Sequence, residues 1–155
     1  MTQSPVSPNN SSNLDQWQPY ELDHHAQKLV LKNRDKKDVL NETHKMRMTV
    51  AYGLERFWGE RFRLEKESKD KANYWKDVWS VTVKILQSSG ITLPNDNITD
   101  KNDNTKYDNT KIEEMADKLW KMDSEDRQIS LMVLTQFCDS LVWWSQRLKT
   151  KNNEN

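Results

Sequence analysis

The chain has 155 residues, of which 34% are hydrophobic and 31% charged, and its 24 basic side chains balance 24 acidic ones. This length favours a single domain, and the zero net charge excludes a long-range field that would attract nucleic acid. The single cysteine, Cys138, excludes an internal disulfide.

The chain begins with a stretch rich in Pro, Ser and Asn, residues 1–18, which lacks the apolar core of a signal peptide. We expect this stretch to be disordered and the protein to be cytoplasmic, because a lone cysteine gives no sign of an oxidising compartment. Pro19 can open a short helix whose apolar side carries Leu22, Ala26, Leu29 and Val30. Its His24 and His25 point about 100° apart, which favours surface histidines over a metal site.

The longest helix is predicted from about Asp38 to Lys69, where apolar residues recur at alternating spacings of four and three. That pattern suits an antiparallel bundle or a short coiled coil. The line contains Val39, Thr43, Met46, Val50, Gly53, Phe57, Glu60 and Leu64. The region from Lys28 to Arg47 is the most basic part of the chain. This indicates a solvent-exposed face or, alternatively, a surface that binds the phosphate backbone of a nucleic acid.

Two interpretations apply to the arginines of this helix. Arg56 precedes Glu60 by four residues and Arg63 follows it by three, which predicts intrahelical ion pairs. Alternatively, the arginines lie beside Trp58 and Phe62 on a cationic and aromatic surface that holds phosphates and stacks on bases. Aromatic residues at helical spacing are more often core residues, so the first interpretation is favoured.

A bend or exposed turn is expected from Ser68 to Asn73, followed by a helix that contains Trp75 and Trp79 and ends at Gly90. The polar segment 94–109 then predicts a long mobile loop with almost nothing to bury. Thr110 and Glu113 match a capping box for the next helix. Its apolar residues are Ile112, Met115, Ala116, Leu119 and Trp120.

The most apolar segment is ISLMVLTQFCDSLVWWSQRL, residues 129–148, which we predict to be a buried central helix capped by Asp123 or Ser124. Gln136, Asp139 and Ser140 interrupt it too often for a membrane crossing. Asp139 is expected to pair with an arginine of the long helix, and Cys138 to fill the core. The predicted fold is all-α, an antiparallel bundle of about five helices with a long polar loop. It forms one domain over residues 19–149, with disordered ends at 1–18 and 150–155.

The sequence contains no phosphate loop, HExxH, CxxC or glycine-flanked nucleophile, so we expect no enzymatic activity, no cofactor and no metal. Seven tryptophans exceed what a small helical core needs, and large aromatic residues anchor protein interfaces. We therefore expect an interaction or scaffold subunit of a larger complex, with a protein partner or further copies of itself and with nucleic-acid contact left open. The alternatives are an adaptor with no nucleic-acid role and, less favoured, a small enzyme without a recognisable motif. Several tryptophans exposed on one patch would indicate a partner surface, and full burial would indicate core packing.

The helical content, the arginine-bearing segment and the terminal WWSQRLK sequence resemble the small helical subunits of CRISPR effector complexes over Asp38 to Lys149. The resemblance implies a role in antiviral defence, in a subunit that lines a filament and touches the guide and target backbone. The residues proposed for phosphate contact under this resemblance are chosen for charge and position: Arg47, Arg56, Arg61, Arg63, Arg147 and Lys149.

Overall fold

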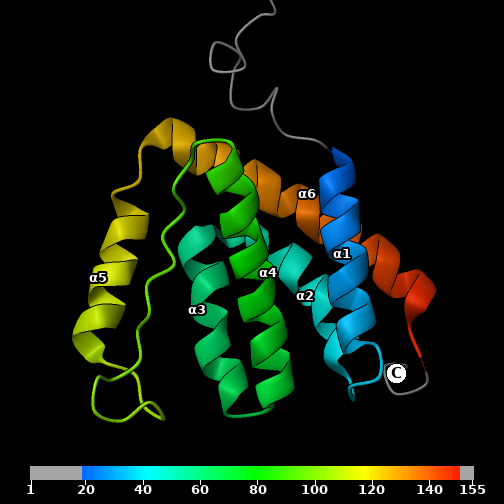
Figure 1. Ribbon diagram of the computed structural model, residues 1–155, viewed down its shortest axis with the longest axis horizontal. Coiled ribbons are helices and arrows are strands. Elements are labelled where there is room, and N and C mark those ends of the chain that lie inside the picture. Colours follow the sequence, from blue (N-terminus) through cyan, green and yellow to red (C-terminus); the bar gives the residue numbers. More distant parts are fainter. Residues whose placement is uncertain (1–18, 151–155) are drawn as a thin grey trace, which may run out of the picture.

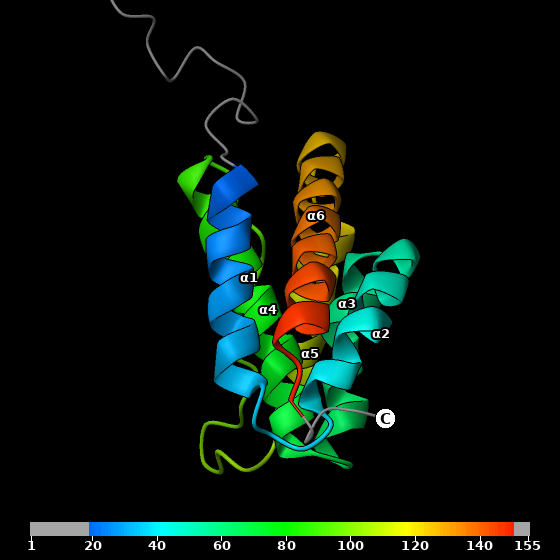
Figure 2. The same ribbon diagram turned by 90° about the vertical axis from the view of Figure 1, so that its right-hand side faces the viewer.

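The longest helix, α6 (Ser124–Leu148), runs obliquely behind α4 and α1 in the view of Figure 1 and lies between α1 and α2 in Figure 2. The computed structural model describes residues 19–150. The side chains of α6 that are fully buried against these neighbours include Val133, Leu134, Phe137, Cys138 and Leu141. The prediction of a buried helix at the centre of the fold is confirmed.

The other α-helices are α1 (Pro19–Asn33), α2 (Glu42–Thr49), α3 (Leu54–Glu65), α4 (Lys69–Ser88) and α5 (Asn109–Trp120). Within residues 19–150 the chain forms no strand, and Thr99 and Tyr107 make only an isolated antiparallel bridge. The all-helical class is therefore confirmed. The antiparallel arrangement of about five helices stays a prediction. The disorder expected for 1–18 and 150–155 also stays a prediction, because apart from Thr150, whose hydroxyl donates to Arg34 O, these residues lie outside the described part of the chain.

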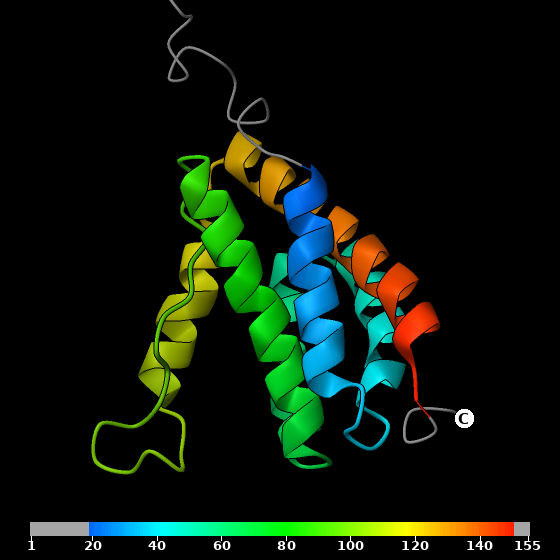
Figure 3. The same ribbon diagram turned by 45° about the vertical axis from the view of Figure 1, so that its right-hand side comes forward.

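Helices α1 and α4 lie side by side and run in opposite directions (Figure 3). The apolar face predicted for α1 is the buried one, because Leu22, Ala26 and Val30 are almost completely covered. At one end of the pair, Lys32 Nζ lies 2.8 Å from Asp77 Oδ2 and fixes the register of the two helices.

The prediction of a single helix from Asp38 to Lys69 is wrong. The chain forms a 3₁₀ turn, η3 (Val39–Asn41), then α2, a second 3₁₀ turn, η4 (Val50–Tyr52), and finally α3. The break falls at Gly53, whose φ of 102° and ψ of 171° belong to a region that is essentially open to glycine alone. Val50 and Leu54, on either side of the break, are both buried, so the apolar pattern continues through a change of direction.

Helix α4 carries the aromatic centre of the core. Ser68 caps it by accepting a hydrogen bond from the Lys71 N–H, and Gly90, with φ of 81°, ends it as expected. Its buried rings pack on Phe57 of α3, with centroids 4.8 Å apart for Trp75 and 6.2 Å apart for Trp79.

The segment from Ser89 to Asp108 runs from the end of α4 to the start of α5, and in the view of Figure 1 it passes between α5 and α3. It buries Ile98, although almost nothing was expected to be buried there, and the Asp108 N–H donates to Ile98 O at 2.8 Å. The mobility of this loop stays a prediction. The predicted capping box is wrong, because the Asp108 carboxylate accepts from Thr110 N and Lys111 N. The Asp123 cap on α6 is confirmed.

Candidate functional site

The tryptophans divide between the core and two separate surfaces. Trp58, Trp75 and Trp79 are buried and Trp144 is half-buried, whereas Trp120 is 65% exposed and Trp143 48% exposed. Trp17 lies outside the described residues. Trp120 ends α5, just before α6 begins, and Trp143 lies near the far end of α6, so the two do not form one patch.

The polar side chains buried in the body mostly satisfy one another. Glu42 is fully buried, and its carboxylate accepts from Trp75 Nε1 at 3.1 Å and from Lys45 Nζ at 3.2 Å. Thr43 Oγ1 lies 2.9 Å from the Tyr74 hydroxyl and 3.1 Å from Ser145 Oγ, which joins α2, α4 and α6. These contacts hold helices together, and they leave the groups little capacity for a ligand.

Two titratable groups in this interior are poor candidates for chemistry. Burial raises the pKa of Tyr74, and its hydrogen bonds with Thr43 and Ser145 offset this only in part. Burial also raises the pKa of the Cys138 thiol well above its ordinary value. A thiol that stays protonated is a weak nucleophile, and Cys138 fills the core as predicted.

Two of the nominated arginines are paired with carboxylates. Arg47 Nε lies 2.6 Å from Asp139 Oδ1, so the ion pair expected for Asp139 is confirmed, although both side chains are largely exposed. Arg63 Nε donates to Glu60, and its Nη1 lies 3.4 Å from Glu67 Oε1. The predicted intrahelical pairing with Glu60 is confirmed for Arg63.

Arg61 is turned inward, with only 9% of the residue exposed. Its Nε donates to Trp58 O at 3.0 Å, and its guanidinium lies 5.4 Å from the centre of a Trp58 ring. Burial lowers the pKa of Arg61 to about 10, with Tyr107 and Glu65 acting in the opposite direction. This guanidinium is not presented to a phosphate backbone.

The remaining nominated residues are separated. Arg147 Cζ lies 3.9 Å from the centre of the Trp143 ring near the end of α6, and Lys149 follows as its C-terminal cap residue. Arg56 is exposed on α3, with Cζ 5.8 Å from the Tyr52 ring. The fold therefore does not bring the six nominated cations together on one surface.

Helix α5 carries an apolar stripe that residues 19–150 leave partly open, because Trp120 is exposed while Ile112 and Ala116 are half-buried. Met115 and Leu119 are fully buried on its inner side. Ile112, Ala116 and Trp120 follow one another at intervals of four residues along a shallow hollow of about 580 Å³. We call these three residues the α5 stripe. Helix α5 itself lies at the edge of the molecule farthest from α1 in the view of Figure 1.

Acidic side chains border the α5 stripe. Glu113, Glu114 and Asp117 line the same hollow. Asp117 pairs with Lys121 at 2.8 Å, whereas Glu113 and Glu114 form no ion pair with any residue between 19 and 150. The stripe is thus an apolar surface with an acidic border.

The inner side of α5 is fixed by polar contacts at several points. Lys118 Nζ lies 2.7 Å from Asp96 Oδ2 in the preceding loop. Arg127, in the first turns of α6, places Nη1 2.6 Å from Glu55 Oε1 and donates through Nη2 to Leu119 O. The stripe is therefore supported from behind by α3, α6 and the loop.

The sequence contained a signal for this surface. Its apolar residues form two lines rather than one: Met115 with Leu119, and Ile112 with Ala116 and Trp120. The first line is buried and the second faces solvent or lies half-buried. The acidic residues that follow Ile112 and Ala116 mark the second line as the outer one.

Among residues 19–150, no three His, Cys, Asp or Glu side chains are grouped so that they could hold a metal ion. None of the helices in the described part of the chain combines the length and the apolar character needed to cross a membrane. Comparison of the chain with protein-family models, with curated proteins and with solved structures gave no match.

Proposed function

We propose that the protein is a non-enzymatic scaffold subunit that binds a protein partner through the α5 stripe. The observation that carries this proposal is the exposure of Trp120 in line with Ile112 and Ala116. Covering a largely exposed tryptophan removes on the order of 100 Å² from water, which favours binding by about 2 to 3 kcal/mol. A stripe fixed from behind requires little ordering when a partner binds.

The partner segment proposed for this site is a basic amphipathic helix. Residues spaced by four along a helix form a ridge that packs along the apolar face of a second helix. Glu113 and Glu114 form no ion pair within residues 19–150, and the cation nearest in effect to Glu114, Lys118, already pairs with Asp96. Lysine or arginine on the flanks of the partner helix would supply the missing partners. A partner with acidic flanks would be repelled.

Crosslinking and mutation together test this proposal. A photoreactive amino acid at Ala116 of the tagged full-length chain, expressed in the native host, is expected to crosslink to a basic helical segment of one protein. The double variant Ile112→Ser, Trp120→Glu is expected to lose that protein. Trp143→Glu is the matched control, because it changes the other exposed tryptophan, and it should retain the partner. Equal recovery by both variants would reject the site, and a chain that purifies alone would reject the scaffold role.

A second candidate function is contact with a nucleic-acid backbone, as the resemblance to CRISPR small subunits implies. Arg56 is exposed, forms no ion pair within residues 19–150, and lies beside Tyr52, which is 68% exposed. An unpaired guanidinium next to an open aromatic ring can hold a phosphate while a base stacks on the ring. Among the six nominated cations, Arg56 therefore supports this proposal best, because of its position beside Tyr52.

The salt dependence of binding to a single-stranded oligonucleotide tests the second candidate. Arg56→Ala is expected to reduce the slope of log affinity against log salt by about 1, because one phosphate contact is lost. Arg63→Ala is the control, since Glu60 and Glu67 already neutralise that cation. Affinity that does not change with salt, or equal effects of the two variants, would reject this interface.

A further inference from the structure

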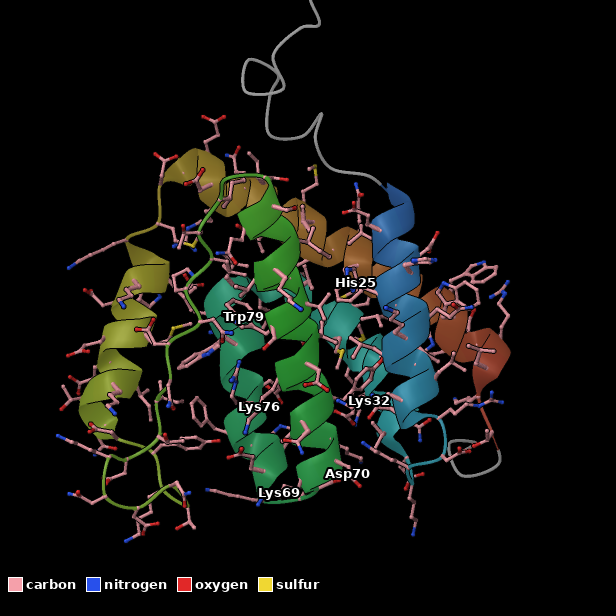
Figure 4. The ribbon with its side chains drawn as sticks, in the orientation of Figure 1. His25, Lys32, Lys69, Asp70, Lys76 and Trp79 are labelled. Atoms are coloured by element: carbon pink, nitrogen blue, oxygen red, sulfur yellow. The ribbon has the colours of Figure 1, made fainter. Side chains whose placement is uncertain are left out.

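A hollow of about 400 Å³ lies between α1 and α4, on the side of the molecule away from α5. Its α1 side is formed by Glu21, His24, His25 and Lys28, and its α4 side by Lys84, Ile85 and Ser88. We call this hollow the α1–α4 groove. Figure 4 shows His25 on the side of α1 that faces α4.

The helix register explains why these side chains meet. Residues His25, Lys28 and Lys32 follow one edge of α1 at spacings of three and four. Because the two helices run in opposite directions and Lys32 pairs with Asp77, residues earlier in α1 meet residues later in α4. The result is that Lys84 lies close enough to His25 to affect its proton affinity.

The groove has more positive than negative charge. Lys28 and Lys84 form no ion pair with any residue of the described chain, while Lys32, one turn below, is neutralised by Asp77. Glu21 is the single acid in the lining. Two lysines and one glutamate leave a charge of +1, and protonation of both histidines would bring it to +3. This excess is local, because the whole chain carries no net charge.

The pKa of His25 reflects the same excess of positive charge in the groove. Partial burial lowers the pKa of His25, and Lys28, Lys84 and His24 lower it further, while Glu21 acts in the opposite direction. An anion in the groove would oppose the effect of the cations and raise the pKa of His25. By linkage, protonation of His25 would then strengthen binding of the anion.

We propose that the α1–α4 groove binds the phosphate group of a small organic phosphate, held between Lys28 and Lys84 with His25 as a further donor. A dianionic terminal phosphate matches two ammonium groups better than a singly charged anion does. The volume is in the range of small-molecule sites and exceeds what phosphate alone would fill. Ile85, which is buried at the base of the groove, offers an apolar contact for the organic part of the ligand.

Titration of the full-length chain with pyrophosphate and with glycerol phosphate, at constant ionic strength, tests this site. We expect saturable binding of one molecule per chain, measured by calorimetry. The double variant Lys28→Gln, Lys84→Gln should weaken binding at least about tenfold. Lys32→Gln is the matched control on the same edge of α1, and its effect should stay within about twofold because Asp77 already neutralises this lysine.

The pH dependence gives a second measurement. The affinities of the native chain and of His25→Gln are compared at each pH from about 8 to about 6, because a terminal phosphate itself becomes a monoanion near pH 6. The ratio of the two affinities should grow as the pH falls, since protonated His25 supplies an additional charged donor. Binding that does not saturate, or that the double lysine variant leaves unchanged, would overturn the proposal. Tighter binding of a single-stranded oligonucleotide than of pyrophosphate, lost in the same variant, would overturn it in favour of a nucleic-acid site. None of these outcomes depends on the α5 stripe, so this proposal and the proposed function fail separately.

Discussion

Trp79 in α4 and Trp120 in α5 place the same side chain in opposite surroundings. Trp79 is fully buried, its ring lies 6.2 Å from that of Phe57, and its Nε1 donates to Pro94 O at 3.1 Å. Trp120 is 65% exposed at the edge of the molecule. A residue whose ring and N–H are both satisfied internally contributes to stability, whereas one that leaves both to solvent is available for a partner.

Alanine substitution of these two tryptophans should give the largest contrast. Trp79→Ala is expected to lower the free energy of unfolding by about 3 to 5 kcal/mol, because it leaves a cavity and removes a buried hydrogen bond. Trp120→Ala should change it by no more than about 0.5 kcal/mol. Urea denaturation monitored by circular dichroism measures both. Similar losses in the two variants would show that Trp120 also serves the core.

A second substitution separates the inner side of α5 from its outer stripe. Met115→Ala removes a fully buried side chain that attaches α5, and should lower the free energy of local opening by about 2 to 4 kcal/mol. Hydrogen exchange should show faster exchange in α5 and unchanged exchange in the middle of α6. Glu114→Ala, on the exposed side, is the control. Faster exchange throughout the chain would mean that α5 and the body unfold as one unit.

A fall in pH should destabilise the loop before α5, because it protonates the Glu65 carboxylate. Partial burial by itself raises the pKa of Glu65, but hydrogen bonds from Lys76 and Tyr107 outweigh it and leave the pKa below the ordinary 4.5. The stabilisation is therefore complete above the ordinary value and is lost as the pH falls through the lower, folded value. Protection from hydrogen exchange near Tyr107, taken relative to the intrinsic amide exchange rate at each pH, should fall over that range, and Glu65→Gln should remove the fall. An unchanged profile in the variant would assign the effect to another group.

A small effect is expected at the ion pair between Arg47 and Asp139. Both side chains are largely exposed, so Arg47→Ala should change the free energy of unfolding by no more than about 1 kcal/mol. The stability of the native chain should accordingly depend little on salt through this contact. A loss of several kcal/mol in urea denaturation would place this pair among the main supports of the α2 and α6 contact.

Hydrophobic spacing was sufficient to predict the position of α6 and the inner face of α1. The bend expected from Ser68 to Asn73 because of its polar composition is misplaced, since the turn lies at residues 66–68 and α4 already begins at Lys69. Hydrophobic spacing failed at Gly53, because the apolar residues on both sides of the break point to the same core and periodicity carries no information on direction. A glycine inside a helical pattern was the available signal for a break. The Asp108 cap was missed because several Asn, Asp and Thr residues in that loop are equally suitable caps.

The candidate site was harder to predict than the fold. Charge and spacing nominated Arg61, yet the fold turns it inward onto Trp58, which a pattern along one helix cannot reveal. The α5 stripe depends on which elements of residues 19–150 pack against α5, and that is a property of the tertiary fold rather than of one segment. The α1–α4 groove joins residues about sixty positions apart, so no local motif could indicate it.

Arg127 connects α5, at the outer edge of the molecule, to α3 and α6. Its guanidinium holds the carbonyl of Leu119, the residue before Trp120, and the carboxylate of Glu55, the residue before Arg56. A tilt of α5 on engagement at Trp120 would displace that carbonyl, and the guanidinium would have to follow it or release Glu55. Through Arg127, a partner bound at Trp120 would thus alter the position of Glu55 and of the neighbouring Arg56.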